Sequence, residues 1–262
     1  MNILKDKIKL IIFDISGTLI DHGSLATVYT FQKVFKNHNL KIHPELIIKD
    51  MGINKDKHIK KILSHPYISK QLKNNINNKK EIYNNLKKKF NKILKDEVEN
   101  KFDYISGFNN LIKYIRDKNI LIGITTGYPR SILDYILIRF KQDKNFKPDF
   151  AVSASDVKRG RPYNDMVIKI LKKLKIKKFN TIKIDDSISG ILEGKNSGVK
   201  TIGLTLSGIH YLKTRNLRKK ISKRIQDKSH FIIKKKFKKV KTDFIVRDIG
   251  EIKNLLIKNF NC

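Results

Sequence analysis

The sequence predicts an α/β protein whose core is a parallel sheet covered by helices on both sides, with a helical domain inserted near the N-terminus. From about residue 102 onward, short apolar runs alternate with helix-length segments, which is typical of a parallel sheet. An earlier apolar run, at residues 8–13, is followed at once by a turn. We therefore assign residues 1–23 and 102–262 to a Rossmann-like core and residues 24–101 to an inserted helical cap.

The expected strands are short runs that end near polar residues. The first, IKLIIF, is apolar throughout, so we expect it to be buried on both faces of the sheet. Parallel strands end at one common edge, where the loops that follow them build the site. The further strands are expected at residues 120–125, 149–153, 181–184, 200–204 and 243–246.

The cap segment has helical periodicity, no convincing strand and many Lys, Asn and Ile residues. Because it directly follows the first strand and its loop, it is placed to cover the mouth of the sheet and exclude water. A second lysine-rich stretch, residues 212–241, is expected to form a peripheral helix and connector and not a separate domain.

The charge of the chain is strongly positive. Lys and Arg total 58 against 24 Asp and Glu, a formal net charge of +34, which raises nucleic acids and anionic membranes as partners. The lysines occur in nearly every segment instead of along one stripe, so we favour a solvated compositional bias and expect no dedicated nucleic-acid partner. A small anionic substrate is equally compatible with this charge.

The cellular setting is predicted from two features. The only cysteine is Cys262, which excludes an intramolecular disulfide and is typical of a reducing cytosol. No uninterrupted apolar stretch reaches about 18 residues, the length that a membrane span needs. We therefore expect a soluble, cytoplasmic protein without a membrane partner.

The first chemical motif is FDISGTLID, which places Asp14 directly after a buried strand. Gly17 lets the chain turn so that the carboxylate points out of the sheet edge. An aspartate in this position can attack phosphorus and form an aspartyl phosphate. Asp14 taken alone could equally do no more than end the strand.

Three later motifs also follow strands. In TTGYPR, the Thr126 hydroxyl and the Gly127 and Tyr128 amides are suited to bind phosphate oxygens. In GRP, the Arg161 guanidinium can neutralise the same phosphate. IKIDDS, at residues 182–187, ends a strand with two carboxylates, which suit a hard cation such as Mg²⁺.

This ordered set resembles the haloacid dehalogenase superfamily of aspartate-nucleophile phosphotransferases over nearly the whole chain. The four motifs of that superfamily match Asp14 with Gly17 and Thr18, then Thr126, then Arg161, then Asp185 with Asp186. The resemblance implies that Asp14, the backbone carbonyl of Ser16 and Asp186 ligate Mg²⁺, with Asp185 beside the ion but not bound to it. Phosphatases of the superfamily usually carry a second aspartate at the place of Ser16, and a serine hydroxyl is too weak an acid to replace it.

The cap contains MGINKDKHI at residues 51–59. Together with DHGS, GRPY and DDSISGILEG, this pattern resembles the phosphonoacetaldehyde hydrolases, or phosphonatases. The resemblance implies that Lys55 forms a Schiff base with the aldehyde, that His58 assists proton transfers and that Met51 lies beside the amine. It also implies a small phosphonate substrate, cleaved to acetaldehyde and phosphate, and a homodimer formed through the cap.

The chemistry explains why an amine is needed. Direct cleavage of a phosphorus to carbon bond expels a carbanion, whereas a protonated imine accepts the electrons and leaves as an enamine. The condensation requires neutral Lys55, and we expect burial together with the charges of Lys57, Lys60 or Lys61 to lower its pKa. Lys55 and His58 share a face if the segment is helical.

Three positions depart from the phosphonatase pattern. Ser16 stands where alanine is common, Lys57 where an aspartate often precedes the histidine, and Gly190 where many relatives carry an acidic residue. One alternative is a phosphatase or phosphotransferase of the superfamily acting on a sugar phosphate or phosphoglycolate, with Lys55 as a binding cation only. Another is a basic nucleic-acid-binding protein with a degenerate core.

Overall fold

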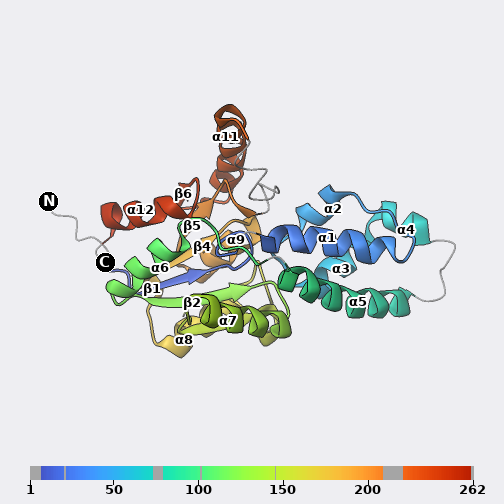
Figure 1. Ribbon diagram of the computed structural model, residues 1–262, viewed down its shortest axis with the longest axis horizontal. Helices are drawn as coiled ribbons and strands as arrows, with labels where there is room; N and C mark the ends of the chain where they lie inside the picture. Colours follow the sequence, from blue (N-terminus) through green and yellow to red (C-terminus); the bar gives the residue numbers. More distant parts are fainter. Residues whose placement is uncertain are drawn as a thin grey trace.

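The computed structural model describes residues 7–20, 22–72, 79–100, 102–144, 146–208 and 221–260. The sheet and its covering helices form one body, and a bundle of helices extends from it to the right in Figure 1. Asp21 of the DHGS motif, Cys262 and the first part of the lysine-rich stretch 212–241 lie outside the described residues.

The core is a six-stranded parallel sheet in the order β3-β2-β1-β4-β5-β6. The predicted fold class and all of the predicted strands are confirmed, although the first strand begins two residues later than the apolar run. The strands are β1 (Leu10–Phe13), β2 (Leu121–Thr126), β3 (Phe150–Ser153), β4 (Thr181–Asp185), β5 (Lys200–Leu204) and β6 (Phe244–Val246). Because β1 lies between β2 and β4, its C-terminal end is the centre of the edge where the loops meet.

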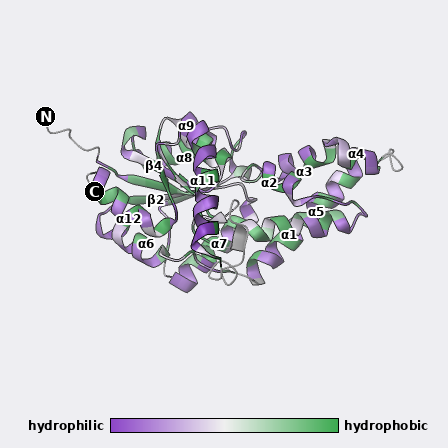
Figure 2. Cartoon of the chain, turned by 90° about the horizontal axis from the view of Figure 1, so that it is seen from above, coloured by the Kyte–Doolittle hydropathy of each residue, from purple (hydrophilic) through white to green (hydrophobic). Residues whose placement is uncertain are grey.

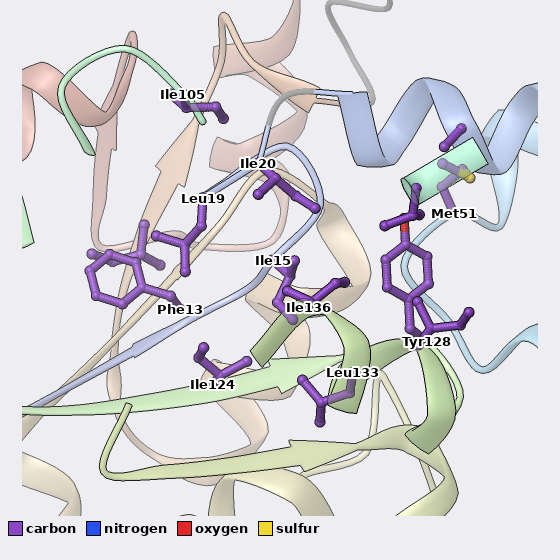
Figure 3. Packing of buried hydrophobic residues seen from close by; sticks show 14 of the residues in the cluster. Phe13, Ile15, Leu19, Ile20, Met51, Ile105, Ile124, Tyr128, Leu133 and Ile136 are labelled. Carbon is purple, nitrogen blue, oxygen red and sulfur yellow. The ribbon is translucent and has the colours of Figure 1, made fainter. Parts of the chain in front are cut away.

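Alternate residues of β1 serve the two faces of the sheet. Leu10 and Ile12 pack in a cluster with Ile170 of α8 (Asp165–Leu174). Phe13 faces the opposite way, into the cluster that contains Leu133 of α7 (Arg130–Lys144) and the strand residue Ile124, and Figure 3 shows its ring beside Leu19. This two-residue alternation buries every side chain of the strand, and each large one contributes roughly 1.5–3 kcal/mol.

Helices complete both layers of the core. Figure 2 shows α6 (Phe108–Asp117) and α12 (Ile252–Asn259) with α7 on one face of the sheet, and α9 (Ile188–Ser197) with α8 on the other. α11 (Lys223–Lys239) projects from the core in Figure 1 and buries only Ile233 and Phe237, which pack against Ile191. This helix is therefore peripheral, as the lysine-rich sequence predicts.

The inserted segment is a helical bundle. It contains α1 (His22–Lys36), α2 (Pro44–Lys49), α3 (Lys55–Ser64), α4 (Pro66–Leu72) and α5 (Lys79–Asn100). Along α5 every fourth residue from Leu86 to Val98 is buried, and this stripe meets α1 where the Phe31 and Phe90 ring centroids lie 4.5 Å apart. In Figure 2 hydrophilic and hydrophobic residues alternate along the ribbons of these helices. Within the described residues, the model has no helix with the length and apolarity needed to traverse a bilayer.

Candidate active site

A small cavity lies between the C-terminal edge of the sheet and the cap. The core contributes the loops that follow β1, β2, β3 and β4, and the cap contributes the loop before α3, the first residue of α3 and part of α1. The cavity is lined by all of the predicted site residues except His58, namely Asp14, Ser16, Met51, Lys55, Thr126, Gly127, Tyr128, Arg161 and Asp186. Residues far apart in the sequence thus meet at one point.

Asp14 directly follows β1, and its amide donates to the Ile184 carbonyl oxygen of β4 at 3.0 Å. Its side chain is buried, and Arg161 Nη2 lies 2.8 Å from Oδ1. Burial raises the pKa of Asp14 to about 6, although the Arg161 charge opposes this rise. The carboxylate is therefore ionised, and able to act as a nucleophile, near neutral pH.

Three buried carboxylates meet beside the cavity. One oxygen from each of Asp14, Asp185 and Asp186 lies within 4.8 Å of the others. The Asp186 carboxylate packs between Gly17 and Gly208. A β-carbon would lie 2.5 Å from Asp186 Oδ2 if it were added to Gly17, and 1.8 Å from it if it were added to Gly208. This donor set, made of oxygens held at short range, fits a hard divalent cation.

Arg161 is held in place by a buried network of charged and polar groups behind the cavity. Its Nε lies 3.0 Å from Glu193 Oε2, and its Nη2 donates to the Thr125 carbonyl oxygen at 2.9 Å. Lys183, fully buried in β4, lies 2.6 Å from Asp185 Oδ2 and 3.8 Å from Glu193 Oε2. The result is a buried network of alternating charges that fixes Arg161 against Asp14.

Sequence reasoning missed three members of this network. The sequence did contain an indication of the role of Lys183, because a lysine inside an apolar strand that is buried on both faces needs an anionic partner. No such indication exists for Glu193, which lies within α9, or for Thr125, which directly precedes the predicted Thr126. Their roles depend on contacts with Arg161, a residue distant in sequence.

The loop after β2 holds the predicted phosphate-binding group. The Tyr128 amide donates to Thr126 Oγ1 at 3.2 Å, which engages that amide within the loop and leaves the Thr126 hydroxyl hydrogen to donate elsewhere. Figure 3 shows the Tyr128 side chain extending from the sheet edge to Met51 of the cap. Burial raises the pKa of Tyr128 to about 12, so its hydroxyl is neutral at physiological pH.

Lys55 is the first residue of α3. Asn54 caps this helix by accepting a hydrogen bond from the Lys57 amide at 3.2 Å, which fixes the start of the helix at Lys55, a residue of the cavity lining. Only 4% of Lys55 is exposed. Burial lowers its pKa to about 8; the Asp14 charge opposes that change and the Arg161 charge adds to it.

The prediction that nearby cap lysines supply the positive charge beside the Lys55 amine was wrong. Lys57 lies over the Tyr163 ring, Lys60 lies over the Tyr83 ring, and Lys61 pairs with Asp50. These contacts engage all three ammonium groups elsewhere. The positive charge that acts on Lys55 comes from Arg161, in the core.

His58 lies behind Lys55 and not on the cavity wall. It is fully buried in the cap, with its ring centroid 4.5 Å from that of Phe31. Burial and the Lys55 charge hold the pKa of His58 well below 6.5, so the ring is neutral. A neutral imidazole one turn along the helix adds no charge next to the amine.

The cap and the core meet along a narrow seam. Ser189 Oγ, on α9, donates to the Met51 carbonyl oxygen at 3.1 Å. A β-carbon on Gly127 would lie 2.7 Å from the Gly52 carbonyl oxygen and 2.8 Å from that of Ile53, so only glycine permits this approach. The seam brings Lys55 to the cavity that Asp14 lines.

Comparisons with known proteins agree with this site. Residues 11–204 match the family of haloacid dehalogenase-like hydrolases. The chain is 34% identical over 203 residues to a phosphonoacetaldehyde hydrolase of Bacillus mycoides, with 76% of each chain covered. It is 29% identical over 255 residues to one of Bacillus cereus, covering 95% of this chain and 96% of that protein.

The chain belongs to the phosphonoacetaldehyde hydrolase family of the haloacid dehalogenase-like hydrolases. A solved structure of a phosphonoacetaldehyde hydrolase-like protein from Oleispira antarctica is similar to this hydrolase, with a TM-score of 0.91 and 26% identity. The similarity covers 98% of this chain and 95% of that one.

Two of the departures from the family pattern in this hydrolase have a structural explanation. Lys57 stacks on Tyr163 at 5.7 Å from the ring centroid, so it links the cap to the loop that carries Arg161. Gly190 leaves room for Asp185, whose carboxylate occupies the space that a side chain at position 190 would need. The third, Ser16, lines the cavity and presents no acidic side chain to it.

Proposed function

We propose that this hydrolase cleaves the phosphorus to carbon bond of phosphonoacetaldehyde, giving acetaldehyde and phosphate. The observation that carries the proposal is the convergence of Lys55 and Asp14 on one cavity, an amine with a lowered pKa beside a buried carboxylate. These are the two nucleophiles that the reaction needs, one for carbon and one for phosphorus.

In the first step the neutral Lys55 amine attacks the aldehyde carbon, and loss of water leaves a protonated imine. With a pKa of about 8, roughly a tenth of Lys55 is neutral at pH 7, about 300-fold more than for a lysine with a pKa of 10.5. Burial of the amine therefore serves the condensation directly.

In the second step an oxygen of Asp14 attacks phosphorus. The electron pair of the breaking phosphorus to carbon bond moves into the imine, which becomes an enamine, while the phosphoryl group becomes an aspartyl phosphate. Arg161 and the Thr126 hydroxyl are placed to stabilise charge on the transferring group. Mg²⁺, held by Asp14, Asp186 and the Ser16 carbonyl oxygen, would neutralise charge on the phosphonate when bound.

In the last step the enamine takes a proton at carbon, and water hydrolyses both the resulting imine and the aspartyl phosphate. The leaving group accepts its proton at carbon after the bond has broken, so no acid is needed at position 16 to protonate an alkoxide. Ser16 is therefore compatible with this reaction, whereas it is a poor fit for the hydrolysis of phosphate esters.

The side chains around the amine are uncharged. His58 lies one turn from Lys55 on α3 and is neutral, so it adds no positive charge that would oppose formation of the protonated imine, and the assistance in proton transfer that the family motif implies for it stays a prediction. Tyr128, with Lys55 Nζ 5.7 Å from its ring centroid, and Met51 enclose the amine. A homodimer formed through the cap and the absence of a nucleic-acid partner stay predictions.

Borohydride trapping tests the proposal. Incubation of the full chain with phosphonoacetaldehyde and borohydride should give a reduced adduct on Lys55, identified by peptide mass spectrometry, and Lys55→Arg should give none. Acetaldehyde release should disappear in Lys55→Arg and in Asp14→Asn. Absence of an adduct, combined with phosphate release from sugar phosphates or phosphoglycolate, would overturn the proposal in favour of a phosphatase.

A further inference from the structure

Tyr163 lies on the outer side of the loop that carries Arg161. Its side chain is 46% exposed, whereas Arg161, two residues earlier, is buried. Two cations lie over its ring: Lys57 Nζ of the cap is 5.7 Å from the ring centroid, and Arg159 Cζ of the same loop is 4.8 Å from it. A cation within about 6 Å of an aromatic centroid is attracted by the electrons of the ring face. The Lys57 contact therefore joins the cap to the core at the protein surface.

The backbone on both sides of Tyr163 is tied to α9. Asn196 Nδ2 donates to the Pro162 carbonyl oxygen at 2.8 Å, and Asn164 Nδ2 donates to the Asn196 carbonyl oxygen at 3.0 Å. The Tyr163 amide donates in turn to the Gly160 carbonyl oxygen at 3.3 Å. The ring is thus presented to the cap from a loop that is anchored on the core.

Arg159 is held beside the ring by Asp165. Its Nη2 donates to Asp165 Oδ1 at 3.0 Å, and its backbone amide donates to Asp165 Oδ2 at 3.1 Å. Two cations at one ring repel each other, and the Asp165 carboxylate offsets that repulsion because it neutralises Arg159. The core therefore offers a fixed aromatic ring on which one lysine of the cap can dock.

The contact is close in sequence to both halves of the candidate active site. Lys57 lies two residues after Lys55 on α3, and Tyr163 lies two residues after Arg161. Arg161 Nη2 is in turn 2.8 Å from Asp14 Oδ1. A contact between Lys57 and Tyr163 therefore restricts how far the amine can move from the carboxylate.

This contact and the Ser189 hydrogen bond hold the cap at two separate places. Ser189 donates to the Met51 carbonyl oxygen and belongs to the helix after β4, whereas Tyr163 follows β3. These two strands lie on opposite sides of β1 in the sheet. A cap held at one place could rock about that point, and a second contact limits such rocking.

We propose that Tyr163 and Lys57 are positioning residues, whose contact is a latch that keeps the cap closed over the cavity and sets Lys55 against Asp14. Lys57 departs from the family pattern, so the latch is a feature of this chain. The effect of the latch on turnover rests on the proposed function. Its effect on the accessibility of Lys55 does not.

Turnover of variants tests the latch. Lys57→Met and Tyr163→Leu should each lower kcat/KM for phosphonoacetaldehyde about two- to fivefold, the loss expected for one exposed contact between a cation and a ring. The double variant should lose no more than either single variant, because both changes remove the same contact. Lys57→Arg and Tyr163→Phe keep a cation and a ring, and should keep the parental value. Additive losses in the double variant would overturn the latch.

Lys177→Met is the matched control. Lys177 Nζ also lies 5.7 Å from the centroid of an exposed ring, that of Phe179. Both residues precede β4 and so lie at the end of the sheet opposite the cavity. This variant should turn over like the parent, and a loss equal to that of Lys57→Met would overturn a specific role for the latch.

Chemical labelling tests closure of the cap without the substrate. Because only 4% of Lys55 is exposed, its methylation by formaldehyde and cyanoborohydride requires the cap to open. The rate, followed by peptide mass spectrometry, should rise about two- to fivefold in Lys57→Met and Tyr163→Leu. It should stay parental in Tyr163→Phe and Lys177→Met. Parental rates in Lys57→Met and Tyr163→Leu would overturn the latch.

The two proposals fail in different ways. If the labelling rates follow this pattern while the parent releases no acetaldehyde, the latch stands and the substrate assignment is wrong. If the parent releases acetaldehyde but Lys57→Met and Tyr163→Leu match it in both turnover and labelling, the substrate assignment stands and the latch is wrong.

Discussion

Ser189 Oγ donates a hydrogen bond to the Met51 carbonyl oxygen at 3.1 Å, which ties the helix after the carboxylate cluster to the cap. Ser187 Oγ lies 3.3 Å from Ser189 Oγ and donates to Asp185 at 2.7 Å. Both hydroxyl hydrogens are used in these two bonds, so the serines are in contact but do not form a continuous hydrogen-bonded chain. Through the Ser189 bond, the start of α9 is coupled to the loop that precedes Lys55.

Ser189→Ala should weaken this coupling without unfolding the protein. Loss of one hydrogen bond of about 1 kcal/mol should reduce kcat/KM for phosphonoacetaldehyde roughly five- to tenfold, measured by acetaldehyde release. Ser64→Ala is the matched control, because it removes a hydroxyl that donates within the cap to the Lys61 carbonyl oxygen, away from the seam. Equal losses in the two variants would exclude a specific role for Ser189.

Gly127→Ala should obstruct closure of the cap. The new β-carbon would lie 2.7 Å and 2.8 Å from two backbone oxygens of the cap. Movement of a side chain cannot relieve this clash, because both oxygens belong to the backbone. We expect at least about a 100-fold loss of kcat/KM with little change in Tm. Gly160→Ala is the control, because its β-carbon would meet its nearest neighbours at ordinary distances of 3.4 Å and 3.5 Å. Comparable activity of the two variants would contradict this account of the seam.

The rate of borohydride trapping on Lys55 should depend on pH in a defined direction. The pKa is lowered to about 8, and the neutral form reacts, so the rate should rise roughly tenfold per pH unit below 8 and level off above it. Initial rates of adduct formation between pH 6 and 10 would show this profile. A midpoint near 10.5, the value of an exposed lysine, would mean that burial does not tune the amine.

Lys183→Met should destabilise the core. The substitution leaves Asp185 and Glu193 buried without their shared cation, which costs about 3–5 kcal/mol of unfolding free energy in a urea titration. Lys195→Met removes a half-exposed pair with Asp243 at 3.0 Å and should change the free energy by less than about 1 kcal/mol. Similar values for the two variants would show that the buried network adds nothing to stability.

Much of the fold follows from local pattern. Apolar runs predicted each strand, and the turn residues after them predicted where Asp14, Thr126 and Asp186 lie, because parallel strands end at one edge. The burial of Lys55 in the cavity also agrees with the family motif in the cap.

Other parts of the site depend on contacts between distant segments and could not be predicted. The three lysines near Lys55 in sequence point elsewhere, and Arg161 acts on the amine instead. The meeting of Glu193 with Arg161 and the exclusion between Asp185 and Gly190 are also properties of the packed structure. A pattern in sequence carries no information on such distances.

Lys55 and Asp14 belong to different structural units, since Lys55 begins a cap helix while Asp14 directly follows a strand of the sheet. Under the proposed function, the sheet carries the groups for phosphoryl transfer and the insertion decides which substrates are activated. Replacement of the loop and first turn around Lys55 in a laboratory or natural lineage should therefore redirect the choice of bond while the phosphoryl machinery stays unchanged.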